Sequence, residues 1–345
     1  MLPHCDNKRI IMEINETYMR RALQLAANGR GFTAPNPMVG AVIVAPDGRV
    51  IGEGWHRRCG EGHAEVNAVA SVRDADRHLL TESTIYVTLE PCSHYGKTPP
   101  CAKLIVDTGI PRVVVGAGDP NPKVNGRGIA MIREAGGEVV TGVLAEESIS
   151  LNKVFFTAQT LRRPYITLKW AQSADGYMDV KRSPDQPAYP FSTPQTRMAT
   201  MKLRSENEAI LTTAATVNAD NPRLTLRDWA GHQPRPFILD RSGRVCPDAN
   251  LLKSAVVLTG NDPFETLYSE YGITSVLVEA GPRYLSHLLE SGMWDSLRVE
   301  ISPVVLGERG GHPAPSLPFA CGILEKEEQS GDNRFLYFRR NGSIV

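Results

Sequence analysis

The first half of the chain alternates between two hydrophobic periods, one typical of helices and one typical of strands. Between Asn15 and Asn28 the apolar residues recur at helical spacing, so we expect a helix capped by Asn15. Shorter apolar runs predict strands, and Asp47-Gly48 marks a tight turn between two of them. This alternation predicts a sheet covered by helices. The expected helices cover 15–28, 63–72, 101–108 and 126–135, and the expected strands cover 40–45, 50–55, 84–89, 112–116 and 138–143.

A second alternating series follows a helical stretch at 144–160, which Arg162-Arg163-Pro164 ends. A loop is expected at 218–223, a long final strand at 296–306, and a tail rich in glycine and proline after Gly307. The other expected strands cover 165–170, 209–212, 236–240, 255–259 and 275–279, and the expected helices cover 193–205 and 284–291. Because domains usually hold roughly 100–200 residues, the 345 residues predict two α/β domains, 1–150 and 160–345.

Composition and charge narrow the class of protein. Lysine plus arginine equals aspartate plus glutamate, at 38 each, so no global basic field favours binding to nucleic acid. The longest apolar runs are strand-length, whereas a membrane-spanning helix needs about 20 apolar residues. The first 15 residues show no secretory pattern, so we expect a cytoplasmic protein with no membrane partner. Six cysteines are too few for a disulfide scaffold, so a clustered pair is expected to bind metal or act in catalysis.

The strongest chemical signal is a set of metal-ligand residue types in the first half. His63, Cys92 and Cys101 offer one nitrogen and two sulfur donors, a set that suits zinc. Three protein ligands leave a fourth position for water, as in catalytic zinc sites, and zinc lowers the pKa of such a water toward roughly 7. Glu65 would then take the water proton and return it to a leaving amine.

The expected helix positions support this reading. Cys101 follows two prolines that a first helical turn tolerates, so it is expected at a helix N-terminus, where the dipole favours a thiolate. His63 is likewise expected to open a helix. The zinc-deaminase signature is H-x-E followed by P-C-x-x-C, and here the gap between the cysteines is longer. The alternative interpretation is a pair of unrelated thiols and a surface histidine.

Around these residues the sequence closely resembles a family of bifunctional deaminase/reductases of riboflavin biosynthesis. The longer gap between Cys92 and Cys101 is that family's own variant. The resemblance covers nearly the whole chain and is most specific before residue 130. Its motifs in the first half are Pro35-Asn36-Pro37-Met38-Val39-Gly40, His63-Ala64-Glu65, the stretch from Thr88 through Glu90-Pro91-Cys92-Ser93-His94 to Pro99-Pro100-Cys101, and Asp119-Pro120-Asn121-Pro122.

The resemblance implies a cytidine-deaminase-like α/β/α fold for the first domain. It also implies hydrolytic deamination of 2,5-diamino-6-ribosylamino-4(3H)-pyrimidinone 5′-phosphate, a small-molecule substrate. Carried over to matching positions, it makes His63, Cys92 and Cys101 the ligands of one zinc ion per chain and Glu65 the proton donor. The substrate contacts that it implies are Asn36, His56, His94 and Lys97.

The second half shows a weaker chemical signal by itself. No G-x-G-x-x-G occurs in the chain, so the dinucleotide-binding fingerprint is absent. The strand expected at 275–279 runs into Ala280-Gly281-Pro282-Arg283 and then a helix. A glycine at a helix start lets phosphate approach free N–H groups, and Arg283 adds charge. A plain strand-to-helix turn is the alternative.

The resemblance implies a dihydrofolate-reductase-like α/β fold for this half. It implies NADPH-dependent reduction of the ribosyl group of 5-amino-6-(5-phosphoribosylamino)uracil to ribityl, and it implies a homo-oligomer. Lys169 would assist proton transfer to the opening sugar, and Arg204 and Arg227 would suit the substrate phosphate. The implied cofactor contacts are Thr216, Asp220, Gly281, Pro282 and Arg283. The implied substrate contacts are Arg204, Leu224, Arg227 and Glu279.

One segment departs from the family pattern. The family usually carries Ser-x-Trp-Ile before Thr193-Pro194, and this chain has Ala188-Tyr189-Pro190-Phe191. A deaminase with a decayed reductase domain is therefore an alternative. Two others are a nucleoside or nucleic-acid deaminase with an unrelated second domain, and a non-enzymatic binding module whose structural zinc takes His94 as a fourth ligand.

Overall fold

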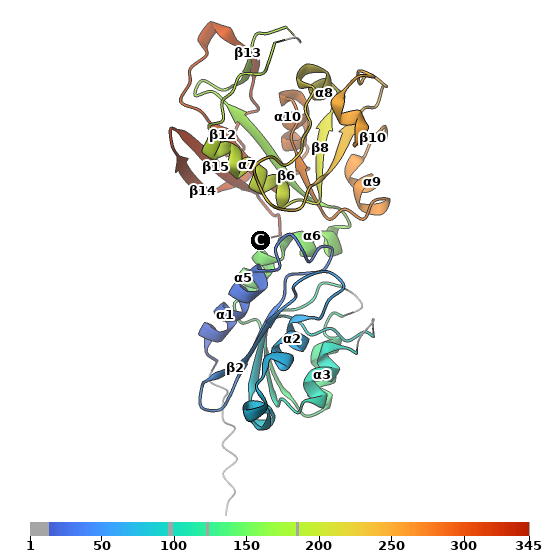
Figure 1. The fold of residues 1–345 in the computed structure, drawn as a ribbon, viewed down its shortest axis with the longest axis vertical. Helices are drawn as coiled ribbons and strands as arrows, with labels where there is room; N and C mark the ends of the chain where they lie inside the picture. Colours follow the sequence, from blue (N-terminus) through green and yellow to red (C-terminus); the bar gives the residue numbers. More distant parts are fainter. Residues whose placement is uncertain (1–13, 96–98, 122–123, 184–185, 345) are drawn as a thin grey trace, which may run out of the picture. The chain divides into compact units, whose positions relative to one another are not determined.

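The structure is a computed structural model that describes residues 14–95, 99–121, 124–183 and 186–344. These residues divide into two compact units (Figure 1). The first unit contains residues 14–29 and the described part of 38–151, and the second contains residues 30–37 and the described part of 152–344. None of the helices in the described ranges combines the length and hydropathy needed to cross a membrane.

A five-stranded sheet in the order β2-β1-β3-β4-β5 forms the centre of the first unit. β1 is antiparallel to β2 and β3, whereas β3, β4 and β5 are parallel. The strands are β1 (Gly40–Val44), β2 (Val50–Trp55), β3 (Thr84–Leu89), β4 (Arg112–Ala117) and β5 (Glu138–Thr141). The helices are α1 (Glu16–Ala27), α2 (Ala64–Ser71), the 3₁₀ helix η1 (Asp74–Glu82), α3 (Cys101–Asp107), α4 (Arg127–Glu134) and α5 (Ala145–Leu151).

Alternation along these strands places side chains on two faces, each covered by helices. Ile43 and Ile85 pack with residues of α2, α3 and α4, while Val42 and Tyr86 pack with residues of α1. The side chain of Asn15 caps α1, as predicted. Gly54 lets α2 approach β2 closely, because a Cβ there would lie 2.3 Å from the backbone nitrogen of Ala68. The close packing fixes the helix that carries Glu65.

An eight-stranded sheet in the order β10-β9-β8-β11-β6-β12-β15-β14 forms the centre of the second unit. The first six strands in this order, β10, β9, β8, β11, β6 and β12, are parallel to one another. β15 is antiparallel to both of its neighbours, β12 and β14. β7 (Tyr177–Val180) pairs with β13 (Gly310–Pro313) in a separate two-stranded sheet. The sheet strands are β6 (Tyr165–Gln172), β8 (Ala209–Thr213), β9 (Arg235–Leu239), β10 (Val256–Leu258), β11 (Ser275–Val278), β12 (Ser296–Ile301), β14 (Gly322–Ser330) and β15 (Asn333–Arg340).

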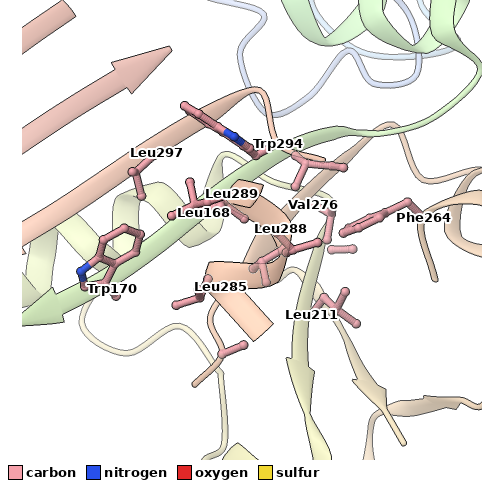
Figure 2. Close-up of a cluster of buried hydrophobic side chains, with 14 of the residues drawn as sticks. Leu168, Trp170, Leu211, Phe264, Val276, Leu285, Leu288, Leu289, Trp294 and Leu297 are labelled. Carbon is pink, nitrogen blue, oxygen red and sulfur yellow. The ribbon is translucent and has the colours of Figure 1, made fainter. Parts of the chain in front are cut away.

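The helices of this unit pack against the large sheet through apolar stripes. Figure 2 shows Leu285 and Leu288 of one helix beside Leu168, Leu211 and Val276 of three neighbouring strands. Burying such side chains stabilises the fold by roughly 1.5–3 kcal/mol each. The helices are α6 (Lys153–Leu161), α7 (Pro194–Ser205), α8 (Ala214–Asp220), α9 (Pro263–Ser269) and α10 (Pro282–Glu290), with short 3₁₀ turns η2 (Asn250–Lys253) and η3 (Gly307–Arg309).

The structure corrects several element predictions. The helix expected at 144–160 is two helices, α5 and α6, which are separated at Asn152. The loop expected at 218–223 begins with the last turn of α8, which the Thr213 side chain caps. The final strand stops at Ile301 rather than 306, just before Pro303, whose missing N–H cannot join a ladder. The tail holds β14 and β15, which were not predicted. β14 is an edge strand of mainly exposed, charged residues with no apolar alternation, whereas β15 contains the apolar run Phe335-Leu336-Tyr337-Phe338, which the sequence interpretation missed.

Candidate active sites

The first unit brings the three predicted metal ligands together. His63 is the N-cap residue of α2, Cys92 lies just after β3, and Cys101 is the first residue of α3. Their ligand atoms all lie within 4.8 Å of one another. Nδ1 of His63 is 3.2 Å from Sγ of Cys101 and 3.6 Å from Sγ of Cys92. Ligands of a tetrahedral zinc ion lie roughly 3.6–3.8 Å apart, so this donor set fits zinc.

Local hydrogen bonds stabilise a thiolate at Cys92. The thiol of Cys101, the ring of His63 and the backbone N–H of Cys101 lower the pKa of Cys92 despite its burial. The last of these contacts is 3.3 Å long, from the N–H of Cys101 to Sγ of Cys92. The same thiol contact raises the pKa of Cys101, and the contact with Cys92 raises the pKa of His63. Of the three donors, only Cys92 therefore loses its proton more readily than usual, and a bound cation would displace the protons of the other two.

Glu65 lies in the first turn of α2 and is only 3% exposed. Burial, and then the charge of Cys92, raise the pKa of its carboxyl. The carboxyl is also hydrogen-bonded to Cys101. The first turn of α2 therefore brings Glu65 to the metal cluster, where a carboxyl of raised pKa suits proton transfer.

The predicted substrate contacts of this domain differ in how close they lie to the metal cluster and in how far they are buried. His56 is buried, its ring lies edge-on to His63 at 5.4 Å, and burial lowers its pKa. His94 is exposed and is not in the cluster of three ligands that the described residues form. Asn36 lies in a turn closed by its N–H bond to Thr33, in the segment that groups with the second unit. Lys97 lies outside the described residues. The substrate-binding roles of all four stay predictions.

Two acidic residues beside the cluster had no role in the sequence interpretation. The carboxylate of Glu90 accepts hydrogen bonds from the N–H groups of Gly126 at 2.9 Å and Gly128 at 3.1 Å. Asp119 is 8% exposed, and burial raises its pKa to about 6, with further contributions from Glu90 and Cys92. The signal was available in the sequence, since Glu90 is two residues before Cys92. Its partners, however, are backbone groups that no side-chain pattern reveals.

The second unit has a cavity of about 820 Å³ at the carboxyl ends of β8, β9 and β11. All five predicted cofactor contacts line it, namely Thr216, Asp220, Gly281, Pro282 and Arg283. The hydroxyl of Thr216 accepts a hydrogen bond from the N–H of Gly281 at 3.0 Å, which ties α8 to the start of α10. Arg241 and Arg244 add positive charge to the wall. A cavity of this size and charge fits a phosphate-bearing dinucleotide such as NADPH.

A second cavity of about 310 Å³ shares Thr216, Asp220 and two further lining residues with the first. It is lined by four residues predicted to contact substrate or move protons, which are Lys169, Arg204, Leu224 and Glu279. Arg227 is exposed and is not among the described residues that line this cavity. Arg197 does line it, although the sequence interpretation did not select it. Asp220 is ion-paired with Arg182, another lining residue of the larger cavity that was not predicted.

Electrostatics distinguish the charged groups of the smaller cavity. Burial lowers the pKa of Lys169, which lies half-buried on β6. Burial alone would raise the pKa of Glu279, but the charge and hydrogen bonds of Arg204 outweigh it and lower the pKa to about 2. The cavity therefore combines a lysine that releases its proton more easily than usual with a carboxylate that stays ionised.

Comparison with protein families assigns each of the two units to a known domain family. Residues 12–117 match the model of the cytidine and deoxycytidylate deaminase zinc-binding region. Residues 164–320 match the model of the RibD C-terminal domain. The second match includes residues 188–191, where the chain departs from the family pattern, and the residues that line both cavities of the second unit. The two sites described above therefore fall in two family domains.

Single-chain relatives match this chain across both units. The chain is 36% identical to the riboflavin biosynthesis protein RibD of Aquifex aeolicus, over 96% of this chain and 100% of that one. It is 37% identical to the Escherichia coli protein of the same name, over 85% and 89% of the two chains. The solved structure of Acinetobacter baumannii RibD matches with a TM-score of 0.84 at 32% identity, over 94% and 98% of the chains. A Thermotoga maritima structure described as a diaminohydroxyphosphoribosylaminopyrimidine deaminase/5-amino-6-(5-phosphoribosylamino)uracil reductase matches with a TM-score of 0.82 at 35% identity, over the same shares. The chain belongs to the RibD family of riboflavin biosynthesis proteins and is a bifunctional enzyme, a zinc-dependent deaminase joined to an NADPH-dependent reductase.

Proposed function

We propose that this chain deaminates 2,5-diamino-6-ribosylamino-4(3H)-pyrimidinone 5′-phosphate in its first domain. It then reduces the ribosyl group of the product, 5-amino-6-(5-phosphoribosylamino)uracil, to ribityl in its second. The observation that carries the proposal is the buried Glu65 beside His63, Cys92 and Cys101, together with a separate reductase cavity. The description of the Thermotoga relative includes both activities, which supports the proposal. We assign the deaminase to residues 1–150 and the reductase to residues 160–345.

In the deaminase, the protein's own groups bind the metal and move protons. His63, Cys92 and Cys101 would hold zinc, which when bound supplies the Lewis acidity that makes water nucleophilic near neutral pH. The carboxylate of Glu65 takes a proton from the attacking water and delivers it to the leaving amine. Its raised pKa helps it to retain the proton between the two transfers. Burial lowers the pKa of His56, which favours its neutral form, and its ring offers a hydrogen bond to the substrate.

In the reductase, the large cavity would hold NADPH, which when bound supplies a hydride. Thr216, Asp220 and the turn at Gly281-Pro282-Arg283 form the part of the wall that would bind it. Lys169 donates a proton to the ribose ring oxygen as the sugar opens, and burial, which lowers its pKa, favours that release. Glu279 stays ionised and orients substrate hydroxyl groups.

The substrate phosphate has a candidate partner in each domain. Lys97 is the proposed one in the deaminase. In the reductase the guanidinium of Arg204 is paired with Glu279, so Arg197 in the same cavity wall is the more available cation. We further propose that the enzyme works in the cytoplasm as a homo-oligomer. Size-exclusion chromatography with light scattering would test the oligomeric state.

Product analysis tests the proposed function directly. The purified enzyme is incubated with the diamino-pyrimidinone ribosyl phosphate, with and without NADPH. We expect the deaminated ribosyl product without NADPH and the ribityl product with it. Recovery of unchanged substrate would contradict the deaminase. Accumulation of the deaminated product in the presence of NADPH would contradict the reductase and favour a deaminase with a decayed second domain.

A further inference from the structure

The segment in which this chain departs from its family, Ala188-Tyr189-Pro190-Phe191, lines the reductase cavities, and its two aromatic residues have no assigned role. We infer that Tyr189 is the residue on which the pyrimidine ring of the reductase substrate stacks, and that it thereby contributes to substrate selection. The inference rests on the proposed function, because it concerns the substrate of that same site.

Hydrogen bonds hold the segment that carries Tyr189 in place at both ends. The N–H of Tyr189 donates to Oδ1 of Asp179 on β7 at 2.9 Å. Two residues on, the carbonyl of Phe191 accepts from Nδ2 of Asn333 on β15 at 2.9 Å. The hydroxyl of Ser192 donates to the buried carboxylate of Glu300 on β12 at 2.8 Å. Tyr189 is therefore presented by backbone that is attached to three strands.

The ring of Tyr189 packs against that of Phe191. Its centroid is 4.9 Å from that of Phe191, at an interplanar angle of 49°. Phe191 is only 6% exposed, whereas Tyr189 is half-buried. The exposed part of Tyr189 lines the 310 Å³ cavity, in whose wall Lys169 and Glu279 also lie. Phe191 also lines this cavity, so the two packed rings form an aromatic wall in which Tyr189 is the more exposed ring.

The lining of the two cavities indicates which ligand this wall meets. Among the described residues, Tyr189 lines the smaller cavity, and its neighbour Ala188 lines the larger one that fits the cofactor. The small side chain of Ala188 leaves the cofactor side open, and the aromatic ring lies on the substrate side. An aminouracil ring is planar and heteroaromatic, so it gains stacking energy on such a face.

The charged residues of the same cavity leave this role to Tyr189. Lys169 and Glu279 can meet the ribose and the polar edge of the ring, and Arg197 can meet the phosphate. None of these groups offers an apolar flat face. The other aromatic residues in the lining, Trp170 and Phe191, are only 2% and 6% exposed, whereas Tyr189 is half-buried and so presents the most accessible ring. Stacking on Tyr189 would fix the plane of the base, and with it the direction in which the ribose enters the site.

Steady-state kinetics with 5-amino-6-(5-phosphoribosylamino)uracil test the inference on the full-length enzyme. We expect Tyr189→Leu, which keeps bulk but lacks a π-face, to raise KM for this substrate about 5- to 100-fold. Tyr189→Phe is expected to keep KM within about twofold of the wild type, because the ring and not the hydroxyl stacks. The Kd for NADPH, measured by fluorescence titration, is expected to stay unchanged in both variants. Gln195→Ala, at an exposed position on α7, serves as the matched control.

Three outcomes would overturn the inference. An unchanged KM in Tyr189→Leu would show that the ring does not bind the base. A weaker Kd for NADPH with unchanged KM would place the ring on the cofactor. A raised KM in Tyr189→Phe equal to that in Tyr189→Leu would assign the effect to the hydroxyl. Failure of the proposed function is distinguishable, because the wild-type enzyme itself would then not reduce this substrate.

Discussion

Arg204 on α7 and Glu279 at the end of β11 form a two-point ion pair in the wall of the reductase cavity. Nε of Arg204 donates to Oε1 of Glu279 at 2.9 Å, and Nη2 donates to Oε2 at 2.8 Å. Nη1 donates to the carbonyl of Thr225 at 3.2 Å, so the same guanidinium also fixes the loop after α8. Both side chains are largely buried, at 10% and 15% exposure. The pair therefore links three segments that line the site.

Breaking this pair on one side is expected to destabilise the second unit. Arg204→Met leaves the carboxylate of Glu279 largely buried without its partner, which costs about 3–5 kcal/mol in the free energy of unfolding. Urea unfolding measures the change, and Arg227→Met, at an exposed position, is the control. A loss below about 1 kcal/mol for Arg204→Met would show that solvent compensates for the missing guanidinium.

The same pair predicts how stability depends on pH. The pKa of Glu279 is lowered from 4.5 to about 2, so its ionised form stabilises the fold fully above pH 4.5. That contribution is lost as the pH falls from 4.5 toward 2. The difference in unfolding free energy between the wild type and Glu279→Gln should therefore shrink by about 2 kcal/mol between pH 7 and pH 3. A constant difference over this range would contradict the lowered pKa.

Glu65→Gln is expected to separate metal binding from catalysis. The amide keeps the volume of the buried side chain but cannot carry the proton, so deamination should fall by about 10²- to 10⁴-fold. Zinc content, measured by elemental analysis, should remain about one ion per chain. Glu61→Gln, at an exposed position four residues upstream, should behave as the wild type. Deamination by Glu65→Gln at the wild-type rate would show that another group moves the proton.

Metal removal is expected to affect one activity only. The three zinc ligands belong to the first unit, and both reductase cavities are lined by residues of the second. Dialysis against a chelator should abolish deamination, while NADPH oxidation with the deaminated substrate should continue. Zinc added back should restore the first activity. Loss of both activities at equal rates would show that the second unit depends on the metal for its fold.

Gly128→Ala is expected to disturb the zinc site through the backbone. A Cβ at this position would lie 1.9 Å from the carbonyl oxygen of Pro91, the residue directly before Cys92. Since backbone must move to accommodate it, we expect a loss of about 1–3 kcal/mol in stability and weaker zinc retention during dialysis. Ala130→Ser, on the same helix, is the control for helix propensity. Unchanged zinc retention in Gly128→Ala would show that the loop shifts without moving Cys92.

The sequence by itself determined the order of most helices and strands, because their apolar periods are local. It also predicted the residues that could hold zinc, since the types and spacing of His63, Cys92 and Cys101 are themselves the chemical signal, and the structure brings these three side chains together. Strands without apolar alternation could not be predicted from the sequence pattern. The charged edge strand β14 gains its stability from its ladder with β15 and not from a buried face.

Only the tertiary structure decided which charges pair and which remain available. Arg204 and Arg227 are equivalent cations in the sequence, yet one is held by Glu279 while the other is exposed and outside the cavity lining. Glu90 similarly acquires its partners from the N–H groups of Gly126 and Gly128, far along the chain. Burial and pairing depend on contacts between distant segments, and these set the pKa of each group. For that reason the sequence determined which residues could do the chemistry, and the fold decided the protonation and partners with which they do it.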